Sequence, residues 1–170
     1  MPTRTRSTSS GPAPTTFAPR SRGTTPNILA IIGNILNAVG ALYFAGAQHV
    51  VVPNLPDLGL TPEGRASGVG PLATLLSETF NTYLEAALAT HAPNTVRIDV
   101  FRLMNQTVND PSEYGFTNVT SKCLTGAGVC AAPEEYLFWD HVHPTTHGHA
   151  VLADKFARAI NQGFVKQHRR

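Results

Sequence analysis

Apolar residues along this chain alternate between helical and strand-like spacing, and this alternation limits the folds that are open to it. Helical spacing predicts helices over residues 28–43 and 72–88, and a further helix over residues 146–162. Each of the first two is followed by a short run rich in β-branched residues, 49–52 and 95–101, which we expect to form buried strands. Helices that alternate with apolar strands predict an α/β fold with a parallel sheet.

Between residue 101 and the last helix the pattern is weaker. We expect a short helix at residues 102–109, a loop at 110–135, and a short strand or extended segment at 136–139. Central strands that are apolar on both faces need neighbours on each side. We therefore expect the N-terminal strands of the sheet to belong upstream of Asn27 and to be missing here.

Composition divides the 170 residues into three parts. Residues 1–26 are rich in Ser, Thr, Pro and Arg, and we predict that they are disordered. Residues 27–163 hold the patterned sequence and are expected to form one domain or part of one. Residues 164–170 form a basic tail that is most simply a solvated end.

Charge and hydropathy argue against two classes of partner. Charged residues make up 14% of the chain, the net charge is +2, and no basic stripe is interleaved with aromatic residues, so we expect no nucleic-acid partner. Residues 28–52 are apolar, but they include Asn34, Asn37 and Gln48, so we expect a buried helix and strand there and no transmembrane segment. No apolar signal-peptide core is visible at the N-terminus.

The motif that carries chemistry is FWDHVHPT at residues 138–145. Asp140 and His143 on one short loop can face the same way, and a carboxylate that accepts from Nδ1–H holds an imidazole in the tautomer that a general base needs. Pro144 restricts His143 to an extended conformation, and Thr145 or Thr146 can cap the helix that follows. On these residues alone, Asp140 can instead simply turn the chain and leave His143 as a surface residue.

The histidine cluster from His141 to His149 allows a different interpretation, as a metal-binding module. Imidazole groups beside a carboxylate are typical of zinc sites. The chain has no H-E-x-x-H motif, however, and Pro144 and Gly148 disfavour a continuous helical face of ligands. We predict no metal and no other cofactor.

Cys123 and Cys130 are the two cysteines of the chain, and a short segment rich in Gly and Thr separates them. A disulfide could close this loop and stabilise the fold by a few kcal/mol. A reduced pair in a cytosolic protein is the alternative, whereas this spacing is not a common zinc motif. We favour the disulfide, and with it a compartment outside the cytosol.

Three strings occur in order along the chain: GAQHVVVPNLPDLGLTP at residues 46–62, YGFTNV at 114–119, and FWDHVHPT at 138–145. With these strings, the chain from Asn27 to about Gly163 resembles the SGNH/GDSL hydrolases, most of all the secreted esterase/lipase and phospholipase–hemolysin branch. The resemblance implies a partial flavodoxin-like fold of three layers, a secreted protein, and hydrolysis of small-molecule or lipid esters of carboxylic acids. It also implies a Ser-His-Asp mechanism in which Asp140 orients the imidazole and His143 is the base.

At other functional positions the chain departs from the pattern of that family. It has no Gly-Asp-Ser block for the nucleophile, and the blocks that supply the oxyanion hole are not recognisable, so both stay unassigned. The serines near the N-terminus lack the strand-turn-helix setting of a nucleophile: Ser7, Ser9, Ser10 and Ser21. We therefore expect the C-terminal part of such a hydrolase, with a catalytically inactive fragment as the alternative. The sequence does not indicate an oligomeric state.

Overall fold

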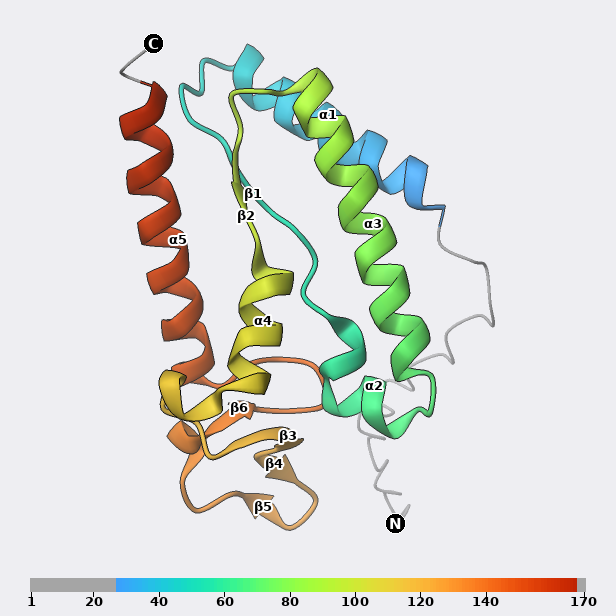
Figure 1. Ribbon diagram of the computed structural model, residues 1–170, viewed down its shortest axis with the longest axis vertical. Coiled ribbons are helices and arrows are strands. Elements are labelled where there is room, and N and C mark those ends of the chain that lie inside the picture. Colours follow the sequence, from blue (N-terminus) through green and yellow to red (C-terminus); the bar gives the residue numbers. More distant parts are fainter. Residues whose placement is uncertain (1–26, 168–170) are drawn as a thin grey trace, which may run out of the picture.

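The computed structural model describes residues 27–167, which contain two parallel strand pairs, one between helices and the other at one end of the molecule below α4 and α5 (Figure 1). The main elements are α1 (Ile28–Phe44), β1 (Val51–Pro53), α3 (Gly70–His91), β2 (Val96–Ile98), α4 (Val100–Asn109), β3 (Asn118–Lys122), β6 (Tyr136–Phe138) and α5 (Thr146–Gln167). The connections contain η1 (Leu58–Leu60), α2 (Pro62–Ala66), η2 (Pro111–Tyr114), β4 (Leu124–Thr125), β5 (Gly128–Val129) and η3 (Pro133–Glu135). The predicted α/β class with parallel strands is confirmed.

The first strand pair is covered by helices on both sides. β1 and β2 run parallel, with Val51 opposite Val96 and Pro53 opposite Ile98. In Figure 1, α1 and α3 lie to one side of this pair and α5 to the other. α5 comes very close to β2, because a Cβ added at Gly163 would lie 2.6 Å from a methyl carbon of Val96. This arrangement has the three layers of an α/β domain.

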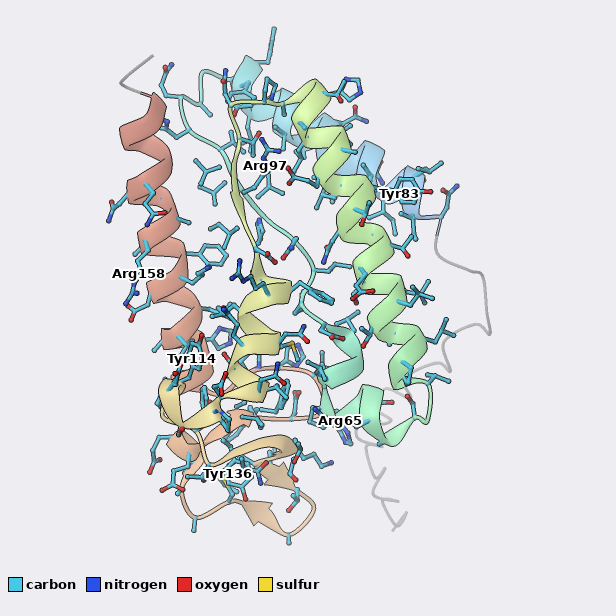
Figure 2. All side chains as sticks on the ribbon, viewed as in Figure 1. Arg65, Tyr83, Arg97, Tyr114, Tyr136 and Arg158 are labelled. Carbon is cyan, nitrogen blue, oxygen red and sulfur yellow. A yellow bond between two sulfur atoms is a disulfide. The ribbon has the colours of Figure 1, made fainter. Side chains whose placement is uncertain are left out.

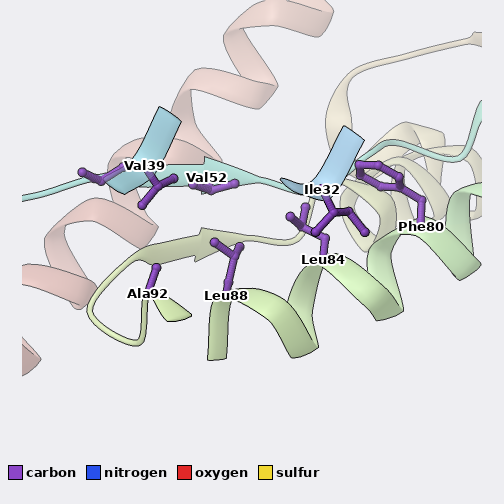
Figure 3. Close-up of a cluster of buried hydrophobic side chains, with 8 residues drawn as sticks. Ile32, Val39, Val52, Phe80, Leu84, Leu88 and Ala92 are labelled. Carbon is purple, nitrogen blue, oxygen red and sulfur yellow. The ribbon is translucent and has the colours of Figure 1, made fainter. Parts of the chain in front are cut away.

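The larger hydrophobic core joins α1, β1 and α3. Figure 3 shows its buried side chains, which come from positions at helical spacing in the two helices and from one strand: Ile32, Val39, Val52, Phe80, Leu84, Leu88 and Ala92. Burying one large apolar side chain of this kind contributes about 1.5–3 kcal/mol to folding. The apolar stripes of the sequence therefore pack these two helices against β1, as their periodicity predicts.

The first helix has a clear signal at each end. The side chain of Asn27 accepts the N–H of Ala30 at 3.1 Å and caps the N-terminus of α1. The helix ends just before Gly46, whose φ of +94° favours a residue without Cβ. The predicted helix over residues 28–43 is thus confirmed to within one residue.

The strand predicted over residues 95–101 is wrong in its second half. β2 ends at Ile98, and Val100 already begins α4. The turn is made by side chains: Asp99 accepts the N–H of Arg102 at 2.9 Å, and Asn54 accepts the N–H groups of Val100 and Phe101. Two caps on the first turn stabilise a helix over residues whose own preference is for a strand.

The loop predicted over residues 110–135 is also wrong, because it contains η2, β3, β4, β5 and η3. β3 pairs in parallel with β6, with Asn118 opposite Tyr136 and Lys122 opposite Phe138. Within β3 only Val119 is buried. A strand with one buried side chain gives almost no alternating pattern, and its pairing comes from a distant segment, so the sequence alone does not reveal it.

The remaining predictions concern the two ends of the chain, a disordered N-terminal segment and a basic C-terminal tail. α5 continues to Gln167, so residues 164–167 are helical, although we assigned them to a tail. The disorder predicted for residues 1–26, and the four serines named there, lie outside the described residues. Among the helices described between residues 27 and 167, none combines the length and hydropathy that crossing a membrane requires.

η1, α2 and α3 meet in a junction that leaves no room for a side chain at two glycines, Gly59 and Gly64. A Cβ on Gly59 would lie 2.2 Å from the carbonyl oxygen of Gly70 and 2.2 Å from Oγ1 of Thr74. A Cβ on Gly64 would lie 2.3 Å from the carbonyl oxygen of Leu58. Both glycines are buried, so this contact fixes where α2 lies relative to α3.

We predict that Gly59→Ala destabilises the protein by about 1–3 kcal/mol, because the new methyl group overlaps backbone that cannot move aside cheaply. The matched control is Gly33→Ala in α1, where nothing lies within 4 Å of the new Cβ. That substitution should instead stabilise the helix by about 0.5–1 kcal/mol. Equilibrium urea unfolding of both variants measures the difference, and equal stability of the two would contradict the close packing at Gly59.

Candidate active site

The loop that carries Asp140 and His143 is closed at its base by strand-like pairing. The N–H of Trp139 donates to the carbonyl oxygen of His143 at 2.8 Å. Phe138 and Pro144 form an antiparallel bridge directly beneath it. Because both ends of the loop are tied together, the residues between them are confined to a tight turn at the end of β6.

Thr145 attaches the start of α5 to β6. Its N–H donates to the carbonyl oxygen of Leu137 at 2.9 Å, and its hydroxyl donates to that of Tyr136 at 2.7 Å. The same hydroxyl oxygen accepts the N–H of Gly148 at 3.1 Å, in the first turn of the helix. Thr145 is therefore the cap of α5, one of the two residues expected for that role, and it is only 2% exposed.

The carboxylate of Asp140 and the ring of His143 are directly paired. Nδ1 of His143 lies 2.8 Å from Oδ2 and 3.1 Å from Oδ1 of Asp140. Oδ1 also accepts the N–H of Val142 at 2.8 Å and the N–H of His143 at 2.7 Å. The same carboxylate thus folds the turn and holds the imidazole, as the spacing of the two residues allows.

This pairing assigns the tautomer of His143 and leaves its other nitrogen available. A carboxylate accepts hydrogen bonds, so Nδ1 carries a proton, and in the neutral ring the lone pair is then on Nε2. The His143 side chain is 75% exposed, and its Nε2 has no hydrogen-bond partner among residues 27–167. An accessible Nε2 with a buttressed Nδ1 is the geometry of a general base.

The same contacts hold the pKa of the Asp140 carboxyl at about 2, below its ordinary value of 3.8. The hydrogen bond from the backbone N–H of His143 is the largest cause. Partial burial opposes it, while the N–H of Val142 and the imidazole of His143 lower the pKa further. Asp140 is therefore a carboxylate at neutral pH.

His141 fastens the outer side of the loop to its neighbours. Its carbonyl oxygen accepts the N–H of Glu63 at 2.9 Å, in the first turn of α2. Its ring lies between two charged side chains, with Nε2 2.6 Å from Nζ of Lys122 and Nδ1 3.4 Å from Oε2 of Glu63. These side-chain contacts are exposed and weak, so the backbone hydrogen bond is the firmer link.

The histidines of the cluster point to different partners. His147 is half-buried; its Nε2 lies 2.9 Å from the carbonyl oxygen of Tyr114, and its ring contacts that of Phe116 at 4.6 Å between centroids. Figure 2 labels Tyr114 beside the lower turn of α5. His149 is exposed on α5. Within residues 27–167, no three His, Cys, Asp or Glu side chains come together as a set that could hold a metal ion.

A disulfide joins Cys123 and Cys130 beside the base of the loop, with their Cα atoms 4.9 Å apart. The N–H of Cys123 donates to the carbonyl oxygen of Phe138 at 3.0 Å, and the N–H of Leu124 donates to that of Trp139 at 2.8 Å. The crosslinked segment therefore extends the β3–β6 pairing up to the residue that precedes Asp140.

Sequence reasoning missed the part played by Asn54. This residue follows β1, where an α/β sheet usually places its functional residues. Its Oδ1 accepts the first two N–H groups of α4 at 2.7 and 3.0 Å, and its Nδ2 donates to Oδ1 of Asp99 at 3.0 Å. Asn54 thus fixes α4 against β1, and its position after a buried strand was the available signal.

Asp57 is a second residue whose role was not predicted. It is 2% exposed, and its Oδ1 accepts the hydroxyl of Thr74 at 2.6 Å and the N–H of Gly59 at 3.0 Å. Its Oδ2 accepts from Nδ2 of Asn105 at 3.3 Å. The buried carboxylate thereby connects η1, α3 and α4, and η1 leads into α2, whose first turn holds the carbonyl of His141.

No serine in the described part of the chain is a partner of His143. Ser67 donates its hydroxyl to the carbonyl oxygen of Gly64 at 2.9 Å. Ser77 donates to that of Ala73 at 3.0 Å and is 1% exposed. The structure brings together the carboxylate and the base predicted from the sequence, and the nucleophile and oxyanion hole remain unassigned.

A family model and the relatives found by sequence comparison both point to GDSL-type esterases and lipases. The family model described as GDSL-like Lipase/Acylhydrolase matches residues 18–156. Esterase EstA of Pseudomonas aeruginosa is 34% identical over 149 residues, which cover 72% of this chain and 23% of that protein. GDSL esterase/lipase APG of Arabidopsis thaliana is 28% identical over 159 residues, which cover 79% of this chain and 44% of that protein. The chain thus spans less than half the length of these relatives.

We predict that Asp140 titrates with a pKa of about 2, and that the pKa stays below 3.8 in His143→Ala. Two backbone N–H groups still bond the carboxylate when the ring is removed. Because the pKa is lowered by folding, the stabilisation is complete above about pH 4 and is lost as the pH falls toward 2. Carboxyl carbon shifts measured by NMR test this, and a pKa of 3.8 or more in His143→Ala would show that the ring holds the turn.

Proposed function

The chain belongs to the GDSL-like lipase/acylhydrolase family, and on that basis we propose that it supplies the acid–base residues for hydrolysis of carboxylic esters. The observation that carries this proposal is the contact of 2.8 Å between Nδ1 of His143 and Oδ2 of Asp140. The accessible Nε2 of His143 supports it, because a base must reach the proton that it removes. In this proposal His143 is the base and Asp140 orients it.

The proposed reaction follows from these two residues. A serine hydroxyl loses its proton to Nε2 of His143 as its oxygen attacks the ester carbonyl carbon. The imidazolium beside Asp140 then donates that proton to the leaving alcohol, and the C–O bond to the alcohol breaks. Water, deprotonated by His143, attacks the acyl-serine, and the proton returns to the serine as the carboxylic acid is released.

The substrate class and location are part of the same proposal. Small-molecule or lipid esters are the substrates that the family suggests, and no cofactor takes part in the steps above. The disulfide between Cys123 and Cys130 supports a secreted protein, because such bonds persist in oxidising compartments. The identity of the relatives as esterases supports the reaction type without fixing the acyl group or the alcohol.

One observation favours a second candidate, a catalytically inactive member of the family. Within residues 27–167, no serine hydroxyl bonds to Nε2 of His143. Loss of a nucleophile lowers the rate of such an enzyme by about 10⁶-fold. The metal-binding module considered from the sequence has no comparable support, since the histidines of the cluster bond to separate partners.

We predict that His143→Ala abolishes covalent labelling of the purified chain by a serine-directed fluorophosphonate. The expected fall in the labelling rate is about 10⁴-fold or more, because the serine is then no longer deprotonated. His149→Ala is the matched control, since this exposed histidine lies on the first turns of α5 and makes no hydrogen bond with Asp140. It should label like the unchanged protein.

Intact mass and peptide mapping read the result. A single adduct that requires His143 identifies the serine and supports an active hydrolase. A folded chain that shows no adduct supports the inactive member. Labelling that survives His143→Ala would mean that His143 is not the base.

A further inference from the structure

Two stretches of the chain match the acceptor motif for N-linked glycosylation, Asn-x-Ser/Thr with x other than Pro. They are Asn105-Gln106-Thr107 in α4 and Asn118-Val119-Thr120 in β3. The atom that receives the sugar is the side-chain amide nitrogen, Nδ2 of the Asn. A motif of three residues also arises by chance, so the contacts of each Nδ2 decide whether the folded protein can carry a sugar there.

The amide nitrogen of Asn105 is fully used inside the fold. Nδ2 donates to the carbonyl oxygen of Phe101 at 3.0 Å and to Oδ2 of Asp57 at 3.3 Å, so both of its N–H groups are bonded. Asp57 is 2% exposed, and so is Thr107, the third residue of the motif. A sugar on this nitrogen would replace one N–H group and place a bulky group beside a buried carboxylate. The first motif is therefore incompatible with a glycan in the folded protein.

The amide of Asn118 is arranged in the opposite way. Its Oδ1 accepts the N–H of Thr120 at 3.2 Å and the N–H of Ser121 at 2.9 Å. Its Nδ2 has no hydrogen-bond partner among residues 27–167. Every buried side-chain nitrogen in that part of the chain has a partner, so the unbonded Nδ2 is open to solvent. A sugar on Nδ2 of Asn118 would break no hydrogen bond of the fold.

The backbone around Asn118 keeps the second motif at the surface. Val119 is buried, whereas Thr120 and Ser121 are exposed. The pairing of β3 with β6 is irregular within this stretch, and the two N–H groups bond the Asn side chain in a local turn. β3 lies with β4 and β5 at one end of the molecule (Figure 1). The third residue of the motif is thus accessible, unlike Thr107.

The disulfide places the same segment in an oxidising compartment. Cys123 follows directly after β3 and is bonded to Cys130. Such bonds persist in secreted proteins, which are also the proteins that carry N-linked glycans. The inference below therefore rests on the secreted location that belongs to the proposed function.

We propose that Asn118 is a site at which this protein carries an N-linked oligosaccharide, and that Asn105 stays unmodified. The donor is a lipid-linked oligosaccharide diphosphate. The bond between Nδ2 and C1 of the first sugar forms, the C1–O bond to the diphosphate breaks, and the diphosphate leaves with the electron pair. One amide proton passes to a base of the transferase. Oδ1 is unchanged by this reaction, so it still accepts the N–H groups of Thr120 and Ser121.

The first test uses the full chain, exported by yeast cells behind a cleavable secretion leader. Peptide-N-glycosidase in heavy-oxygen water leaves an isotopic tag at each Asn that carried a glycan, and peptide mapping by mass spectrometry locates the tags. We expect a tag at Asn118 in most molecules and none at Asn105. An exported, disulfide-bonded protein without a tag at Asn118, or with Asn105 tagged to the same extent, would overturn the proposal.

Variants at two exposed neighbours test the motif itself. Thr120→Ala removes the motif but keeps the backbone N–H that bonds Oδ1, so we expect the glycan to be lost while the urea midpoint of the deglycosylated protein stays the same. Thr120→Ser retains the motif and should retain the glycan. Ser121→Ala is the matched control, because this exposed residue lies outside the motif and its change should leave the glycan in place. A glycan that persists in Thr120→Ala would contradict the assignment.

A second measurement needs no export and separates the site from the location. The purified chain is reduced, unfolded and glycosylated with an oligosaccharyltransferase and a lipid-linked oligosaccharide, then refolded and oxidised. We expect the folded fraction to contain glycans on Asn118 and to exclude glycans on Asn105. This result with a chain that yeast cells do not export would contradict the secreted location alone. A folded fraction that excludes glycans on Asn118, or admits them on Asn105, would overturn the site alone.

Discussion

The carboxylate of Asp140 accepts two backbone N–H groups of its own turn and the ring N–H of His143, so one anion both folds the loop and orients the imidazole of His143. No second side chain is needed to hold the imidazole, because the residue that closes the turn also bonds the ring. A carboxylate bonded by the backbone stays charged down to a pH of about 2, so it remains an acceptor for Nδ1–H of His143. The placement of the His143 ring relative to Asp140 follows from hydrogen bonds within residues 140–143, since the ring itself is exposed.

A rigid surrounding structure keeps this exposed turn in one place. The β3–β6 pairing and the disulfide hold its base, and Thr145 ties it to α5. On the other side, the N–H of Glu63 bonds the carbonyl of His141, and the glycine junction and the buried carboxylate of Asp57 fix the position of α2. Each support is a backbone contact or a buried group, so the loop is positioned by parts of the chain that carry no chemistry themselves.

The loop presents two kinds of surface side by side. His143 points a polar, accessible nitrogen to solvent, while its neighbours Val142 and Pro144 face an apolar pocket.

The sequence by itself determined the long helices and the first strand, because these depend on periodicity. The spacing of Asp140 and His143 allowed their pairing but also allowed a simple turn, and the structure decided for the pairing. The tertiary structure decided the rest. β3 has a single buried side chain and exists as a strand through its pairing with β6; Asn54 and Asp57 gain their roles from helices that lie far from them in the sequence. His147 does not group with the other histidines in the structure. A half-buried imidazole needs a hydrogen-bond partner, and the carbonyl oxygen of Tyr114 supplies one.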